Sequence, residues 1–253
     1  MSTATLEAAE TENAFAAVHP TAFAAAALQR DFWPAHALDW ADADALFVPA
    51  EGDLSLAYQL AKRAIDIVGA LFVLAILAPV MLATLVVLAI TTKGRPLYGQ
   101  VRAGYRGRTF RMWKFRTMRL DADKLQHTVE NEVGGPVFKN RRDPRITRIG
   151  YYLRKFSIDE TPQLFNVLAG DMSLVGPRPL PTHEMARVAP WQRRRLAVLP
   201  GLTCLWQVSG RSDIGFEQWA RMDVWYVENQ SLRTDLWLLL RTPLTVISGR
   251  GAY

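Results

Sequence analysis

The sequence predicts an α/β-type, predominantly helical and compact domain with a small β-hairpin, attached to one kinked membrane helix. Three observations predict this fold class. An uncharged apolar run of 26 residues, Ile67–Thr92, is long enough for a membrane segment. Two extended-looking pieces, Leu97–Arg102 and Thr109–Phe115, flank a turn at Gly104–Gly107 and predict a hairpin. Short helical patterns, separated by glycine and proline, fill most of the remaining chain.

Pro79 divides the apolar run, and its missing backbone donor predicts that the helix kinks or breaks there. The arms Ile67–Ala78 and Val80–Thr92 are each about 18–20 Å long, so neither crosses a hydrocarbon layer of about 30 Å by itself. Basic pairs, which favour the cytoplasmic side, flank both ends of the run: Lys62 with Arg63, and Lys93 with Arg95. A re-entrant segment keeps both pairs on one side, whereas a kinked single span leaves one pair outside. The charges favour re-entry, and both topologies stay open because membrane helices tolerate proline.

We divide the chain into an acidic, Ala-rich N-terminal extension (1–55) that we expect to be largely mobile, a membrane-embedded segment (56–95) and a globular domain (96–253). Residues 1–60 carry nine acidic side chains and one basic one, which leaves a net charge of +14 on residues 61–253. A basic body beside a membrane suits anionic lipids, phosphate-bearing substrates or nucleic acid, and composition does not separate them. The single Cys204 suits a reducing compartment, and the N-terminus predicts no cleavable signal.

Helical patterns recur on both sides of the hairpin. An amphipathic helix leads into the membrane segment, and a basic amphipathic one at Trp191–Val198 is expected to lie on the membrane surface. Gly176–Pro181 holds three prolines and is expected to be extended. The predicted helices are Leu54–Ile65, residues 119–130, Arg148–Phe156, Thr161–Leu168, Trp191–Val198, Phe216–Asn229 and Leu236–Ile247.

The most suggestive chemical feature is the acid pair Asp159 and Glu160. A structural explanation competes, because S-x-x-E is a capping-box pattern with Ser157 as the N-cap. That register puts Pro162 at the fifth helical position, where its missing N–H is a loss, so Thr161 is the better N-cap. Whether Ser157 or Thr161 is the N-cap, a carboxylate that is surrounded by cations can act as a nucleophile towards phosphate. Two adjacent carboxylates also suit a hydrated Mg²⁺.

Basic residues without matching acids predict an anion site. Lys114 and Arg116 alternate with aromatic residues, so on a strand they project from one face. Arg178, between two prolines on a stiff extended stretch, suits bidentate contact with phosphate. Arg145 and Arg154 supply further positive charge.

The segment Pro200–Arg211 combines glycines and small polar residues with Trp206 and Arg211. These side chains would line a nucleotide pocket, or Trp206 is simply part of the core. The chain has no phosphate-binding P-loop pattern, no G-x-G-x-x-G after a strand and no Cys/His metal spacing, so the sequence gives no support to ATP or zinc chemistry.

Together these motifs resemble the bacterial sugar transferase family, the polyprenyl-phosphate hexose-1-phosphate transferases or monotopic phosphoglycosyl transferases. The resemblance covers about residues 56–253 and is greatest to the short members that initiate exopolysaccharide synthesis. It rests on Lys62–Asp66, the segment around Pro79, Lys114–Met118, Ser157–Val167, Gly170–Ser173, Val175–Pro179, Pro200–Arg211 and the terminal Gly251–Tyr253.

The resemblance implies that Asp159 attacks the sugar-bearing phosphate of a UDP-sugar, which releases UMP and leaves a covalent aspartyl-phosphosugar. Polyprenyl (undecaprenyl) phosphate then accepts the sugar phosphate, as the first membrane step of exopolysaccharide biosynthesis. Glu160 matches the carboxylate associated with Mg²⁺. The basic, substrate-contacting positions implied or expected are Arg178, Lys114, Arg116, Arg145, Arg154 and Arg211.

The resemblance also implies a re-entrant helix broken at Pro79, although Ala78 stands where the family often has serine. The expected location is the bacterial inner membrane, with the catalytic domain on the cytoplasmic face. The expected partners are a UDP-sugar, polyprenyl phosphate and membrane lipid, without nucleic acid.

Two alternatives stay open at this point. A membrane-tethered scaffold would bind anionic lipid or nucleic acid without releasing UMP. A direct-displacement transferase would use Asp159 and Glu160 only as metal ligands and form no adduct. The sugar (galactose, glucose or an N-acetylated hexose), the formation of a homo-oligomer and the role of the N-terminal extension are also open.

Overall fold

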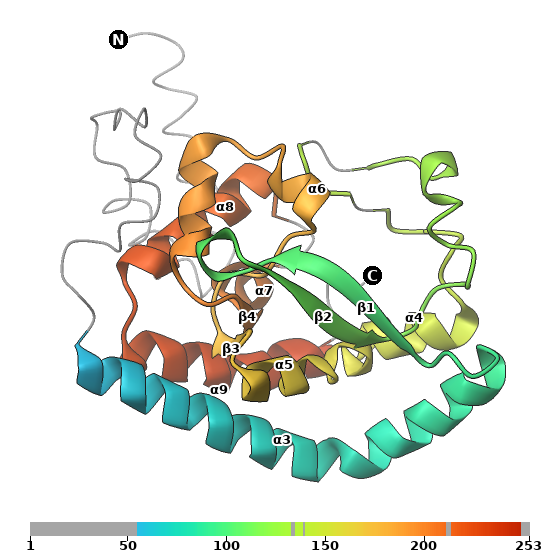
Figure 1. Cartoon of the computed structure of the whole chain (residues 1–253), viewed down its shortest axis with the longest axis horizontal. Coiled ribbons are helices and arrows are strands. Elements are labelled where there is room, and N and C mark those ends of the chain that lie inside the picture. The colour runs from blue at the N-terminus through green and yellow to red at the C-terminus, as the bar shows by residue number, and fades with distance from the viewer. Residues whose placement is uncertain (1–54, 133–134, 139, 211–213, 249–253) are drawn as a thin grey trace, which may run out of the picture. The chain divides into compact units, whose positions relative to one another are not determined.

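The longest element of the computed structural model is α3 (Leu56–Thr91), which runs the length of the described part of the chain (Figure 1). The structure describes residues 55–132, 135–138, 140–210 and 214–248, so the N-terminal extension, Arg211 and the motif Gly251–Tyr253 lie outside the described residues. Among these described residues, α3 is the helix that is long and apolar enough to cross a membrane.

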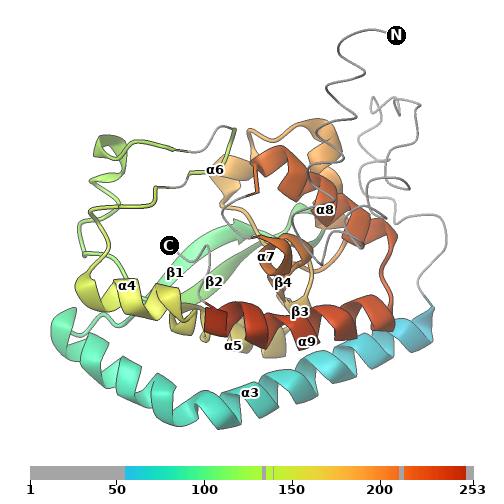
Figure 2. The same cartoon turned by 180° about the vertical axis from the view of Figure 1, so that it is seen from behind.

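Helix α3 continues through Pro79 without interruption, so the alternative of a broken helix is wrong in this structure. The ribbon instead bends near its middle (Figures 1 and 2). The helix begins where Ser55 Oγ accepts a hydrogen bond from the backbone N–H of Tyr58, and the amphipathic helix predicted to lead into the membrane segment forms its first turns. At the other end, Lys93 and Gly94 adopt positive φ angles of 52° and 79°, which reverse the chain into the hairpin.

Both ends of α3 contact the globular domain. Near its start, Lys62 Nζ lies 3.1 Å from the Asp235 carboxylate, and the Asp66 carboxylate accepts a hydrogen bond from the backbone N–H of Leu174. Near its end, Leu88 packs in a buried cluster with Phe115 and Leu153. The apolar side chains between these contacts are largely exposed.

The predicted hairpin is confirmed. Strands β1 (Leu97–Ala103) and β2 (Thr109–Phe115) pair antiparallel, with Tyr98 opposite Lys114. Since alternate residues of a strand share a face, Lys114 lies on the same face as Tyr98, Gln100 and Arg102. The strands are joined by the 3-10 turn Tyr105–Gly107.

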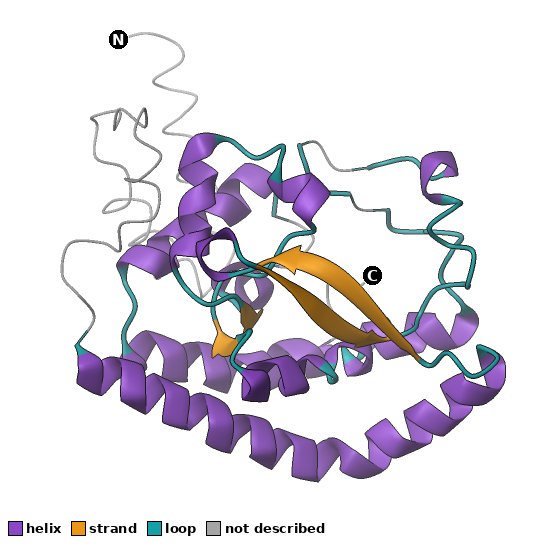
Figure 3. Ribbon diagram, in the orientation of Figure 1, coloured by secondary structure: helices purple, strands orange, loops and turns teal. Residues whose placement is uncertain are grey.

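Helices make up most of the rest of the described chain (Figure 3). Helices α5 and α9 lie alongside α3 in both views, with the hairpin and α6–α8 on their far side (Figures 1 and 2). The α-helices are α4 (Arg148–Lys155), α5 (Gln163–Ala169), α6 (Thr182–Met185), α7 (Leu205–Ser209), α8 (Phe216–Glu228) and α9 (Leu232–Ser248); the 3-10 helices are η3 (Gln126–Thr128), η4 (Ile158–Glu160) and η5 (Pro190–Ala197).

Two predicted helices are wrong. Residues 119–130 form turns and only the short η3. Trp191–Val198 forms the 3-10 helix η5, which packs against α8, with Arg194 half-buried and Arg195 buried. The physical reason is charge pairing, because Arg194 lies 2.6 Å from Glu228 and Arg195 lies 2.6 Å from the buried carboxylate of Asp223.

A second, parallel pair of strands, β3 (Ser173–Val175) and β4 (Gly201–Thr203), forms in segments for which the sequence predicted no strand. The pairing of β3 with β4 requires their two backbones to lie in close contact. A Cβ atom at Gly201 would lie 2.1 Å from the backbone nitrogen of Gly176. The pair thereby fixes the start of the segment that leads to Arg178.

We expect Gly201→Ala to lower the free energy of unfolding by about 1–3 kcal/mol, because the added methyl group must displace backbone atoms. Gly215→Ala is the matched control, since no described atom lies within 4 Å of its added Cβ. Denaturant unfolding of the full chain in detergent measures both. Equal stability of the two variants would contradict the close contact between β3 and β4.

Candidate active site

The acid pair lies on the short 3-10 helix η4, immediately after α4. Ser157 connects the two helices in a left-handed conformation (φ 55°), and its side chain makes no capping hydrogen bond. Helix α5 begins at Gln163 with Pro162 in the N-cap position, so neither the Ser157 capping box nor the Thr161 N-cap is present. The two carboxylates are therefore free of a capping role, and the structural explanation for them is wrong.

Glu160 is held by two cations from distant parts of the chain. Lys114 Nζ, on β2, donates to Glu160 Oε1 at 2.8 Å. Arg178, on the extended segment after β3, donates to both carboxylate oxygens, at 3.1 Å for Oε2. Burial opposes ionisation of Glu160, but Arg178 and Lys114 outweigh it and hold the pKa well below its usual range. Glu160 is thus ionised, and its contacts with Lys114 and Arg178 fix the position of its carboxylate.

Asp159 differs from its neighbour. Its side chain is buried, with 5% of its surface exposed, and within the described residues it makes no hydrogen bond or ion pair. Burial raises its pKa and the negative charge of Glu160 adds to this rise, while Lys114, Arg154 and Arg178 oppose it. A buried, unengaged carboxylate close to several cations has the properties of a nucleophile towards an anionic phosphate.

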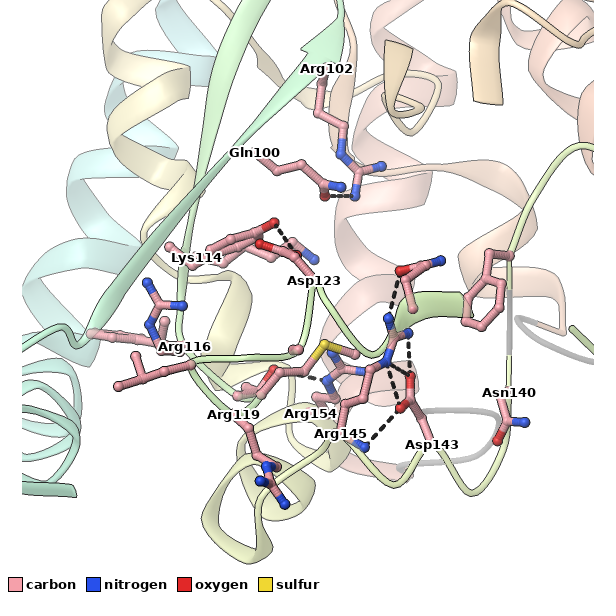
Figure 4. A pocket seen from close by; sticks show the side chains of 18 of the residues that line it. Gln100, Arg102, Lys114, Arg116, Arg119, Asp123, Asn140, Asp143, Arg145 and Arg154 are labelled. Carbon is pink, nitrogen blue, oxygen red and sulfur yellow. Dashed lines mark hydrogen bonds and ion pairs between the residues drawn. The ribbon is translucent and has the colours of Figure 1, made fainter. Parts of the chain in front are cut away.

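A pocket of about 260 Å³ lies on the face of the hairpin that carries Lys114 (Figure 4). Its boundary contains three carboxylates, Asp123, Asp143 and Glu184. Six cationic side chains also line it: Arg102, Lys114, Arg116, Arg119, Arg145 and Arg154. Lys114 both lines the pocket and binds Glu160, so the pocket and the acid pair meet at this side chain. The excess of positive charge fits an anionic ligand.

The structure gives the other predicted basic residues different surroundings. Arg145 is buried and already forms a bidentate pair with Asp143, at 2.9 and 2.7 Å. Arg116 donates to the backbone carbonyls of Arg95 and Leu97. Arg154 donates to the Thr117 hydroxyl and contributes positive charge at Asp159. Arg211 lies outside the described residues.

Sequence reasoning missed the three β1 residues that line the pocket, Tyr98, Gln100 and Arg102. They alternate along a predicted strand, and the register of the hairpin places them beside Lys114. The alternation of these three residues along the strand was visible in the sequence. Only the pairing of the two strands shows that they share the face of Lys114.

The acid pair fits Mg²⁺ only in part. Within the described residues, no three His, Cys, Asp or Glu side chains gather as a ready-made metal site. Mg²⁺ is commonly bound by one or two carboxylates together with substrate phosphates. Asp159 and Glu160 meet that donor number, but both Glu160 oxygens already accept hydrogen bonds. Substrate phosphates would therefore have to complete the ligand set.

Residues 57–249 match the family model described as "Bacterial sugar transferase". The chain is 44% identical over 199 residues to the "Galactosyl transferase CpsE" of Streptococcus agalactiae, covering 77% of this chain and 44% of that protein. It is 41% identical over 202 residues to the "Undecaprenyl-phosphate galactose phosphotransferase" of Salmonella typhimurium, covering 76% of this chain and 41% of that protein.

This chain thus spans less than half the length of these two relatives. It spans almost all of a third, the "Exopolysaccharide production protein ExoY" of Rhizobium meliloti, at 36% identity over 214 residues, with 82% of this chain and 95% of that protein covered. The resemblance drawn from the motifs is confirmed, and the chain belongs to the bacterial sugar transferase family.

Proposed function

We propose that the chain transfers a hexose-1-phosphate from a UDP-sugar to polyprenyl (undecaprenyl) phosphate and releases UMP, as the first membrane step of exopolysaccharide biosynthesis. The observation that carries the proposal is the contrast within the acid pair: Glu160 is clamped by Lys114 and Arg178, while Asp159 is buried beside them without a partner among the described residues. The names of the relatives, which include galactose and N-acetylgalactosamine phosphotransferases, support the reaction class.

The proposed reaction has two displacements at one phosphorus atom. A carboxylate oxygen of Asp159 attacks the sugar-bearing phosphorus, and the bond to the bridging oxygen breaks, so that UMP leaves with the electron pair. A phosphate oxygen of the polyprenyl acceptor then attacks the same phosphorus. The bond to Asp159 breaks and restores the carboxylate, which gives the lipid diphosphosugar.

The basic residues prepare the site for a diphosphate. Lys114 and Arg178 neutralise Glu160 when no substrate is bound, and they exchange this carboxylate for phosphate oxygens when the donor enters. Glu160, released in this exchange, would hold Mg²⁺ together with substrate phosphates. A bound Mg²⁺ would neutralise charge that develops on the diphosphate.

The contacts of α3 support a re-entrant helix. With 36 residues it is about 54 Å long, well above the roughly 30 Å of a hydrocarbon layer. Both its ends nevertheless contact one globular domain, through Lys62 and Asp66 at one end and Leu88 at the other. A helix that crosses the membrane once would separate these ends.

Exposed apolar side chains support helices at the membrane interface. Leu236, Leu240 and Leu244 recur at helical spacing along α9, which lies beside α3 (Figure 2). Tyr151 and Tyr152 are exposed on α4. We propose that these surfaces rest in the interface on the cytoplasmic face of the inner membrane, where the acceptor's phosphate is located.

Asp159→Asn is expected to abolish UMP release from UDP-sugars, because the amide cannot form the acyl phosphate that links Asp159 to the sugar phosphate. Wild-type protein incubated with a donor but no acceptor should gain the mass of a hexosyl phosphate, and the variant should not. Glu217→Gln, at an exposed carboxylate that pairs with Arg221 outside the pocket, is the control and should keep normal activity. Arg178→Ala should slow release without abolishing it.

Three outcomes would contradict parts of this proposal. Normal UMP release by folded Asp159→Asn would refute the nucleophile. Turnover without a mass adduct would favour direct displacement. Salt-sensitive lipid or nucleic-acid binding without UMP release from any UDP-sugar would favour the scaffold. A donor panel with UDP-galactose, UDP-glucose and N-acetylated UDP-hexoses identifies the sugar.

The reaction should fail at acid pH, because Asp159 must be ionised and its pKa is raised by burial. Arg154→Gln removes a cation that lowers this pKa, so the acidic limb of the pH–kcat/KM profile should move to higher pH. Arg148→Gln, at an exposed position of the same helix, should leave the limb in place. An unchanged limb in Arg154→Gln would contradict the electrostatic coupling to Asp159.

Re-entry is tested with single cysteines at the two ends of α3. Ala57→Cys and Lys93→Cys, both at exposed positions and each in a Cys204→Ala background, should react with a membrane-impermeant maleimide only after the cytoplasmic face is opened. A single span predicts instead that one of the two cysteines reacts in intact cells.

A further inference from the structure

Arg102 and Arg119 are cations of the pocket to which neither the sequence motifs nor the proposed chemistry gives a role, and of these two Arg119 is exposed and paired with Asp121. Arg102 lies on β1, on the face shared with Tyr98, Gln100 and Lys114, and it lines the pocket (Figure 4). Its guanidinium donates to the Pro179 carbonyl at 2.8 Å and to Gln100 Oε1 at 2.6 Å. Through Pro179 it contacts the segment that carries Arg178.

The guanidinium of Arg102 is incompletely satisfied. Its Nε atom is buried and has no hydrogen-bond partner among the described residues, and the side chain forms no ion pair with them. Leaving a buried N–H of a charged group unpaired is unfavourable. Burial and the positive charge of Arg178 together lower the pKa of Arg102 to about 10, although Glu184 and Glu160 oppose this shift. The side chain therefore lacks an anion.

The charges around Arg102 indicate where that anion lies. Arg102 interacts electrostatically with Arg178 and Glu160, and both Lys114 and Arg178 bind the Glu160 carboxylate directly. Of the other arginines that line the pocket, Arg145 pairs with Asp143 and Arg119 with Asp121, whereas Arg116 and Arg154 donate to carbonyl or hydroxyl oxygens of described residues. Arg102 thus adds unpaired positive charge where the pocket meets the acid pair.

We propose that Arg102 binds the sugar-bearing phosphate of the nucleotide donor, as a third cation beside Lys114 and Arg178. The proposal rests on the proposed function, because that phosphate is the one that Asp159 attacks. A phosphate oxygen would accept the N–H that has no partner, and the planar guanidinium suits such an oxygen. Lys114 and Arg178 change partners when the donor enters, whereas Arg102 has one N–H, at Nε, that needs no exchange of partner among the described residues.

The test compares UDP with UMP, which lacks the second phosphate. Arg102→Gln should weaken UDP binding by about tenfold to a hundredfold, the range for a lost charge-assisted hydrogen bond, and should weaken UMP binding by much less. Arg102→Lys keeps the charge but loses the planar fork, so its loss of UDP affinity should be smaller. Arg108→Gln, at an exposed arginine of the same hairpin outside the pocket, should leave both affinities unchanged.

Calorimetry on the full-length chain in detergent gives these affinities, and thermal unfolding checks that each variant is folded. If Arg102→Gln does not fold, the UDP-to-UMP comparison on Arg102→Lys carries the test. If the variants lose equal affinity for UDP and for UMP, Arg102 only holds the segment around Pro179 in place. If the variants bind UDP as tightly as the wild type, Arg102 does not contact the phosphate. Both results overturn the proposal, as does a wild-type chain that does not bind UDP.

The two proposals fail separately. A wild-type chain that binds UDP in an Arg102-dependent manner but releases no UMP from any UDP-sugar would refute the transferase reaction and keep the phosphate site. Normal UMP release, together with UDP binding that does not depend on Arg102, would refute the phosphate contact of Arg102 and keep the transferase reaction.

Discussion

The pairing of Glu160 with Lys114 and Arg178 connects three segments that are far apart in the sequence: a strand of the hairpin, the 3-10 turn after α4 and the extended segment after β3. Each of these charges is largely withdrawn from water, and each would be costly without the others. The cluster therefore constrains where the segments meet. It also places the preceding residue, Asp159, close to these cations. The Asp159 carboxylate itself makes no hydrogen bond or ion pair with the described residues.

The long apolar helix α3 supports this cluster from both of its ends. Phe115, next to Lys114, packs on Leu88 near the end of α3, and Ile158, next to Asp159, joins the same cluster. On the other side, Lys62 near the start of α3 donates to the carbonyl of Val175, three residues before Arg178. Both cations that hold Glu160 are thus positioned by contacts with α3. In the proposed function, membrane attachment and the alignment of Asp159 and Glu160 therefore depend on the same helix.

Features that depend on local sequence could be predicted well. The hairpin follows from strand alternation and its glycine turn, and α8 and α9 follow from their apolar periodicity. Predictions failed where a distant partner decides the outcome. The basic segment Trp191–Val198 resembles a surface helix, because nothing nearby reveals that Asp223 and Glu228 will neutralise it. The pair of β3 with β4 was missed for the same reason, since two short strands acquire their identity only from each other.

For the candidate site, the sequence by itself determined the acid pair, the basic motifs around it and the long apolar helix, because these depend on residue type and spacing. Only the tertiary structure decided that Glu160 is clamped while Asp159 is unengaged, that Arg145 is neutralised by Asp143, and that Arg102 lacks an anion. The physical reason is that the charge state and the availability of a side chain depend on its burial and on partners brought together by folding.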